Sequence, residues 1–187
     1  MSNGERRDLL IHAKKKLGKV NAALEIGVHY GEHASMMDNI LEPEKLYLLD
    51  MWGDGYYGKY ATAEYWQKHK AMVVKKFEGR SNVEVVQGDS HIEHANFDDE
   101  SLDFIYIDAD HSYEGISKDI QYWYPKLRKG GIFAGHDYVD PELKAEIGVV
   151  RSVNEFRENH ADDFEEFIVF GKGLKACWLL TTKNTSS

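Results

Sequence analysis

Short apolar segments alternate with helical segments along most of the chain, and this order limits the fold more than any other feature. The apolar segments predict strands at about residues 23–27, 46–49, 83–86, 102–107 and 132–134. Apolar residues at helical spacing predict helices at about residues 4–17, 32–41, 61–77, 113–127 and 147–159. Strands that alternate with helices form a parallel sheet that is covered on both faces. We therefore expect an α/β protein.

The C-terminal part breaks this alternation. Two apolar runs, 164–170 and 176–181, are joined by a Gly-Lys-Gly segment, which predicts a β-hairpin. This hairpin would add an antiparallel strand at one edge of the sheet. Together, the segments predict a Rossmann-like three-layer sandwich with a mostly parallel seven-stranded sheet and a C-terminal antiparallel hairpin. We expect a single domain over residues 1–187, with a disordered tail at about 183–187.

Length and charge exclude several kinds of protein. The 187 residues suit one domain with a sizeable core, and 42% hydrophobic residues place the chain among globular proteins. A formal net charge of −9 argues against binding to nucleic acid or to an anionic membrane. The single cysteine excludes an internal disulfide, and no segment resembles a signal peptide or the ~20 apolar residues of a membrane span. We expect a cytoplasmic protein that binds neither nucleic acid nor membrane.

Polar residues stand at the carboxyl ends of the five predicted parallel strands. The first strand ends at Gly27, and the others end at Asp50, at Asp89, at Asp108 and at a His-Asp pair, residues 136–137. In open α/β sheets, ligands bind in the crevice outside the carboxyl ends of the strands. These residues therefore predict one ligand site, built from parts of the chain that are far apart in sequence.

The turn after the first strand carries glycines at Gly27 and Gly31. In dinucleotide-binding folds, a middle glycine lets the backbone approach a pyrophosphate, but that position here is His29. This difference disfavours NAD. It leaves S-adenosylmethionine (SAM), which has no phosphate, as the candidate cofactor. Alternatively, the small residues serve only to pack a tight turn.

Several side chains suit parts of such a cofactor. Asp50, at the end of the second strand, could accept both ribose hydroxyls. Glu25, inside the first strand, could hold the cofactor's ammonium group, or it could form a structural ion pair. Asp89 could accept a hydrogen bond from the adenine amino group, with the backbone of Ser90 assisting.

Met51 and Trp52 directly follow Asp50 and are the residues best placed to lie against adenine. A loop at about residues 52–60 begins here and is rich in glycine and aromatic residues. Glycine makes such a loop mobile, and aromatic rings give it stacking faces. The loop could be a lid over cofactor or acceptor, or only a flexible surface loop.

Three runs of sequence resemble a known family. The run Leu24–Gly31 resembles motif I of class I SAM-dependent methyltransferases. The runs Phe104–Gly115 and Gly130–Tyr138 are more specific. They resemble the branch that includes macrocin-type and novobiocin-type sugar O-methyltransferases, with catechol O-methyltransferase as a more distant relative. The resemblance covers about residues 20–181. It implies a SAM-binding enzyme that methylates a hydroxyl group of a small molecule.

The resemblance also implies a metal site. Asp108, besides lying at the cofactor, would hold a divalent metal together with His136 and Asp137, and the metal would usually be magnesium. The family usually carries an acid where this chain has His136. Magnesium prefers oxygen ligands, whereas imidazole suits manganese, zinc, iron or nickel better. Either the metal differs, or His136 is not a ligand, or no metal binds.

Two neighbouring residues are candidates for the general base. Asp110 matches the base position of the sugar O-methyltransferases, and His111 lies near the position of the lysine base in the catechol enzymes. Histidine, with an ordinary pKa of about 6.5, can accept a hydroxyl proton at neutral pH. Together, Asp108, Asp110, His136 and Asp137 form a polar cluster that favours oxygen as the methyl acceptor.

Other functions remain as alternatives. A metal-dependent hydrolase or oxygenase could use Asp108, Asp110, His111 and His136, although it would not need Asp50. A non-catalytic SAM-binding module would not need the polar cluster, and an NAD oxidoreductase is disfavoured by the first turn. Leucines of the N-terminal helix could pack on a second subunit, which would give a homo-oligomer, or on the chain's own sheet, which is the favoured alternative.

Overall fold

The computed structural model describes residues 4–53, 62–139, 148–173 and 176–184, and these contain one seven-stranded sheet. The strands are β1 (Ala22–Ile26), β2 (Lys45–Asp50), β3 (Val83–Gln87), β4 (Leu102–Ile107), β5 (Leu127–Gly135), β6 (Phe164–Phe170) and β7 (Cys177–Thr182). Their order is β3-β2-β1-β4-β5-β7-β6. The first five strands pair in parallel, while β7 is antiparallel to both β5 and β6. The predicted sheet is confirmed, with β7 inserted inside the edge strand β6.

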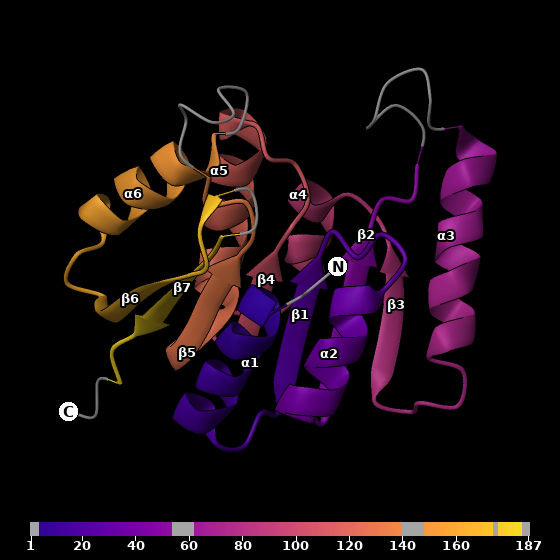
Figure 1. The fold of residues 1–187 in the computed structure, drawn as a ribbon, viewed down its shortest axis with the longest axis horizontal. Helices are drawn as coiled ribbons and strands as arrows, with labels where there is room; N and C mark the ends of the chain where they lie inside the picture. Colours follow the sequence, from indigo (N-terminus) through magenta and orange to yellow (C-terminus); the bar gives the residue numbers. More distant parts are fainter. Residues whose placement is uncertain (1–3, 54–61, 140–147, 174–175, 185–187) are drawn as a thin grey trace.

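Helices cover both faces of this sheet (Figure 1). The α-helices are α1 (Gly4–Leu17), α2 (Glu32–Leu41), α3 (Ala63–Lys76), α4 (Ser90–Glu93), α5 (Tyr113–Trp123) and α6 (Val149–Asn159). Two short 3-10 segments are η2 (His94–Asn96) and η3 (Tyr124–Lys126). Buried residues of α1, α2 and α3 form one core cluster with the sheet, and those of α5 and α6 form another. The predicted three-layer sandwich is therefore present.

The central strand β4 is apolar at four successive positions, 104–107, after the buried Asp103. Phe104 and Tyr106 belong to the core cluster under α1 and α2, whereas Ile105 and Ile107 belong to the cluster under α5 and α6. All four side chains are buried. Side chains of a strand alternate between its two faces, so a strand that is covered on both faces favours apolar residues at successive positions.

Local signals set the ends of α5. Its first turn is capped by Ser112, whose hydroxyl accepts the backbone N–H of Gly115 at 3.1 Å. The predicted end at residue 127 was too late. The α-helix ends at Trp123, and Pro125 lies in η3, because proline has no N–H to donate and clashes with the preceding turn. β5 then begins at Leu127 and not at 132 as predicted.

Two predicted irregular segments fall partly outside the described residues. These are the loop at 52–60, of which residues 54–60 are not described, and the tail at 183–187, of which residues 185–187 are not described. Within the described parts of the chain, no helix is both long enough and apolar enough to cross a membrane.

Candidate functional site

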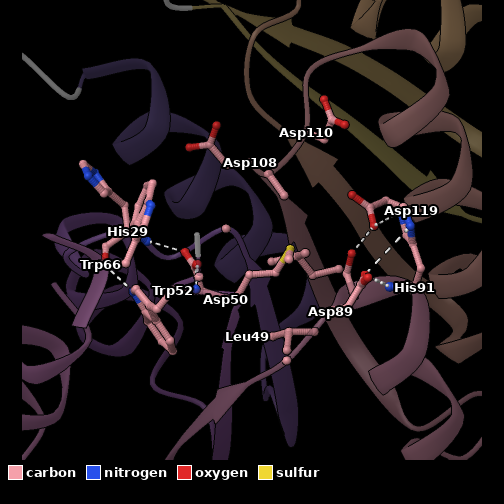
Figure 2. A pocket seen from close by; sticks show the side chains of 17 residues that line it. His29, Leu49, Asp50, Trp52, Trp66, Asp89, His91, Asp108, Asp110 and Asp119 are labelled. Atoms are coloured by element: carbon pink, nitrogen blue, oxygen red, sulfur yellow. Dashed lines mark hydrogen bonds and ion pairs between the residues drawn. The ribbon is translucent and has the colours of Figure 1, made fainter. Parts of the chain in front are cut away.

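A cavity opens at the carboxyl ends of β1, β2, β3 and β4, where the site was predicted (Figure 2). Its lining residues are Ile26, Gly27, His29, Leu49, Asp50, Met51, Trp52, Gly53, Trp66, Gly88, Asp89, Ser90, His91, Asp108, Ala109, Asp110 and Asp119. All predicted cofactor residues except Glu25 and Gly31 are among them. The four strand ends are brought together because parallel strands in one sheet end at the same edge.

Asp50 is held by backbone groups from two sides of the cavity. Its Oδ2 accepts the N–H of His29 and its Oδ1 accepts the N–H of Trp52, both at 2.8 Å. The indole Nε1 of Trp52 in turn donates to the carbonyl of His29 at 2.8 Å, as Figure 2 shows. His29 and Trp52 have φ values of 55° and 37°, in the left-handed region that side chains other than glycine rarely adopt. This arrangement, which we call the Asp50 clamp, fixes the carboxylate while leaving lone pairs for two further donors.

Gly27 brings the ends of β1 and β4 into contact. Its φ is 89°, and a Cβ atom at this position would lie 2.2 Å from the carbonyl oxygen of Asp108. Only glycine fits such an approach. Gly31 also has a positive φ, 78°, and begins α2, but it does not line the cavity.

The β3 end of the cavity is organised by two acids. Asp89 begins α4 and accepts the N–H of His91 at 2.9 Å. Asp119, a buried residue of α5, accepts the hydroxyl of Ser90 at 2.6 Å and lies 3.3 Å from Nε2 of His91. The hydrogen bond to Asp119 raises the pKa of His91, against the effect of burial. This end therefore presents a hydroxyl, an imidazole and a partly exposed carboxylate to a polar ligand.

Glu25 lies behind the cavity, not in its lining. It is 1% exposed, and its Oε1 is 2.9 Å from Nδ1 of the equally buried His33. Burial raises the pKa of Glu25, although the charges of His33 and Arg6 act against it. The geometry matches the structural ion pair that the sequence left open, and a role for Glu25 toward the cofactor stays a prediction.

Met51 and Trp52 differ in what they can offer a ligand. Both line the cavity, but the Met51 side chain is exposed, whereas Trp52 is 1% exposed and packed into the core. Trp52 therefore acts mainly through the Asp50 clamp. Met51 is the better placed of the two to cover a planar ring.

A second polar cluster lies where β4 and β5 end. Nε2 of His111 is 3.2 Å from both Asp108 Oδ1 and Asp137 Oδ2. Nδ1 of His136 is 3.1 Å from Asp137 Oδ2 and 3.7 Å from Asp108 Oδ1. The structure thus brings together all three predicted metal ligands and one predicted base. We refer to these four residues as the β4–β5 cluster.

The N-terminal helix adds a cation to this cluster. Nη2 of Arg6, in α1, lies 2.5 Å from Oδ2 of Asp108. Burial alone would raise the pKa of Asp108, but the hydrogen bond with His111 and the charges of Arg6 and His136 lower it to about 2. Asp108 is therefore ionised at neutral pH and paired with a permanent positive charge.

The β4–β5 cluster meets only part of what a divalent metal requires. Asp108, His111 and Asp137 each offer a ligand atom, and these atoms lie within 4.8 Å of one another. However, the guanidinium of Arg6 already binds Asp108. A metal ion on this carboxylate would share it with a like charge, and ligating nitrogens would have to give up any proton directed at the carboxylates. As placed, the residues do not fit a divalent metal.

Asp110 points away from the cluster toward the start of α5. Its Oδ1 accepts the N–H of Ser112 at 2.8 Å, and a Cβ on Gly115 would lie 2.3 Å from its carboxyl carbon. Asp110 lines the cavity, whereas His111 does not. The structure thus separates the two base candidates, with Asp110 at the cavity and His111 between two carboxylates.

Sequence reasoning missed Arg6, His91 and Asp119. Asp119 carried a readable signal, because it shares the buried face of α5 with Ile116 and Trp123, where a charged residue needs a partner. Arg6 carried no such signal, because it lies 102 positions from Asp108 in a helix whose polar face has several other cations.

Comparison with known proteins gives the class to which this fold and site belong. Residues 24–138 match the model of a family described as a methyltransferase domain. This range covers more than half of the chain and includes the ends of β1 to β5, so the chain belongs to that family of methyltransferase domains. Among curated proteins, no sequence matches the chain significantly.

Solved structures show the same fold. The O-methyltransferase from Bacillus cereus, solved in complex with SAH, is 19% identical, with a TM-score of 0.69 over 98% of this chain and 82% of that one. TomG, an O-methyltransferase from Streptomyces achromogenes involved in tomaymycin synthesis and solved with SAM, is 18% identical, with a TM-score of 0.68 over 98% and 81%. The CurJ carbon methyltransferase is 13% identical, with a TM-score of 0.69 over 97% of this chain, but the chain spans only 54% of its length.

Proposed function

We propose that this protein binds SAM and transfers its methyl group to a hydroxyl group of a small molecule. The observation that carries the proposal is the Asp50 clamp. It holds a carboxylate at the end of β2, between a polar end of the cavity at Asp89 and a second polar end at Asp108. A carboxylate at this place in the fold can accept both hydroxyls of a ribose.

The cofactor would lie along the cavity in one direction. With the ribose on Asp50, the adenine would reach Asp89 and Ser90 and be covered by Met51. The methionine end would pass over Gly27 toward Asp108, because both residues line the cavity and Gly27 has no side chain to obstruct a ligand. The relatives solved with SAM and with SAH support this choice of cofactor.

The acceptor would bind beside Asp108 and Asp110. Methyl transfer is an in-line displacement, in which an acceptor oxygen forms a bond to the methyl carbon as the carbon–sulfur bond breaks. The protein contributes by aligning the two reactants. A hydroxyl must also lose its proton, and Asp110 is the base candidate that lines the cavity. The products would be a methyl ether, S-adenosylhomocysteine (SAH) and a proton on the base.

The β4–β5 cluster would act next to this base. As placed, the residues of this cluster do not fit a divalent metal, so no step of the reaction is assigned to one. Because Arg6 occupies Asp108, we assign the proton transfer to the side chains of the chain itself.

Calorimetric titration with SAH tests the cofactor assignment. We expect a dissociation constant in the micromolar range, which corresponds to a binding free energy of about −8 kcal/mol. Transfer of a labelled methyl group from SAM to a panel of catechols, phenols and sugars then tests the acceptor class. Absence of SAH binding would refute the proposal. SAH binding together with methylation of nitrogen or carbon acceptors alone would keep the cofactor and refute the hydroxyl acceptor.

A further inference from the structure

Arg6 reaches the β4–β5 cluster from a helix outside the matched family region. Its guanidinium lies 2.5 Å from Asp108 Oδ2, and the Arg6 and Asp108 side chains are only 22% and 13% exposed. A largely buried ion pair of this kind is costly to break by removing one partner, because a charge is then left without compensation. The contact is thus part of the folded site and not a loose surface pair.

The position of Arg6 is fixed by the packing of α1. Leu9, Leu10 and Ala13 are fully buried in the core cluster beneath this helix. At the other end of α1, Lys16 pairs with Glu165 of β6 at 2.8 Å. Because α1 is packed along its length, the backbone position of Arg6 is fixed within reach of Asp108, at the end of β4.

Both carboxylates of the cluster already lie against nitrogen atoms of the protein. Asp108 binds Arg6 through one oxygen and faces His111 through the other. Asp137 faces His111 and His136. A divalent cation would therefore have to enter a site where a fixed positive charge stands on the same carboxylate that it needs.

We propose that Arg6 takes the place of a divalent metal at Asp108. Its guanidinium supplies the positive charge at this strand end and keeps divalent cations out of the β4–β5 cluster. Exclusion of metal depends only on Arg6 and the β4–β5 cluster, and not on the proposed function. Its consequence for catalysis, that methyl transfer needs no added metal, rests on the proposed function.

Titration of the full chain with Mn²⁺ by calorimetry tests the exclusion. The wild-type protein should bind Mn²⁺ with a dissociation constant of about a millimolar or weaker. Arg6→Met should bind it about tenfold more tightly or better, because the like charge on Asp108 is gone. The double variant with Asp108→Asn should lose this gain. Arg6→Lys, which keeps the charge, should stay close to wild type.

Arg7→Met is the matched control, since Arg7 is an exposed neighbour on the same helix. It should leave Mn²⁺ affinity unchanged. The proposal would be overturned if the wild-type protein bound Mn²⁺ with micromolar affinity and Asp108→Asn removed this binding. This test needs no Arg6 variant. A folded Arg6→Met protein, judged by circular dichroism, that gains no affinity would overturn the proposal as well.

A SAH titration of the same samples separates the two proposals. If the wild-type protein does not bind SAH, the proposed function is refuted. The Mn²⁺ titrations would still test the exclusion of metal independently. Where a methyl acceptor is found, a chelator should leave wild-type turnover unchanged. A chelator-sensitive wild type that added Mn²⁺ restores would contradict the role given to Arg6.

Discussion

Asp50 is the side chain on which cofactor binding should depend most. Both of its oxygens accept backbone N–H groups and are thereby aimed into the cavity. Asp50→Ala should weaken SAH binding roughly 100-fold or more, because two hydrogen bonds to a charged acceptor are lost. Calorimetry would measure the change. Asp98→Ala, at an exposed acid outside the cavity, should have no effect, and equal loss in both variants would point to a non-specific charge effect.

The two base candidates can be separated by turnover. Asp110→Asn keeps the size of a side chain that lines the cavity and accepts the N–H of Ser112, but it removes the basic carboxylate. It should lower kcat by about 100-fold with little change in SAH affinity. His111→Gln should have a smaller effect, because His111 does not line the cavity. The reverse order would make His111 the base, and full turnover in both variants would exclude both residues.

At the scale of elements, the contact between the ends of β1 and β4 shapes the site. Gly27→Ala would place a Cβ 2.2 Å from the carbonyl oxygen of Asp108, at a φ of 89°. It should reduce the free energy of unfolding by about 2–4 kcal/mol, from crowding together with left-handed strain. Urea denaturation would measure this loss.

Gly18→Ala is the control for the backbone alone. Gly18 has a φ of 66°, and a Cβ there would meet nothing within 4 Å. Its substitution should cost only about 1 kcal/mol. If both alanine variants lost the same stability, the close approach of the two strands would not be the reason for glycine at position 27.

At the scale of the whole molecule, His91 should make stability depend on pH. Its hydrogen bond to Asp119 raises the pKa of His91 above its ordinary value. A histidine with a raised pKa in the folded state gives its full contribution below a pH of about 6.5. The contribution is lost as the pH rises through the raised pKa. The effect should be a few tenths of a kcal/mol, because the ring is partly exposed.

Titration of the His91 ring protons by NMR would measure this pKa directly. Asp119→Asn should return it toward the ordinary value and flatten the fall in unfolding free energy between about pH 6 and pH 8. A His91 pKa at or below that of free histidine in the wild-type protein would contradict the contact. The cytoplasmic location and the homo-oligomer stay predictions at this scale, although Leu9 and Leu10 pack into the chain's own core.

The order of elements and the place of the site followed from the sequence, because both depend on local patterns. An apolar run such as 104–107 indicates a strand covered on both faces, and an acid at its end marks the ligand-binding edge. For the same reason Asp50, Asp89 and Asp108 could be assigned to one cavity before their distances were known.

Only the tertiary structure decided which of these residues have partners. Glu25 could be a ligand or an ion pair by sequence, and its burial beside His33 supplied the ion pair. Arg6 meets Asp108 across 102 positions of chain. Such contacts depend on how α1 docks on the sheet, and no local pattern carries that information. The charge at the β4–β5 cluster, and with it the expected response to metal, was therefore set by packing.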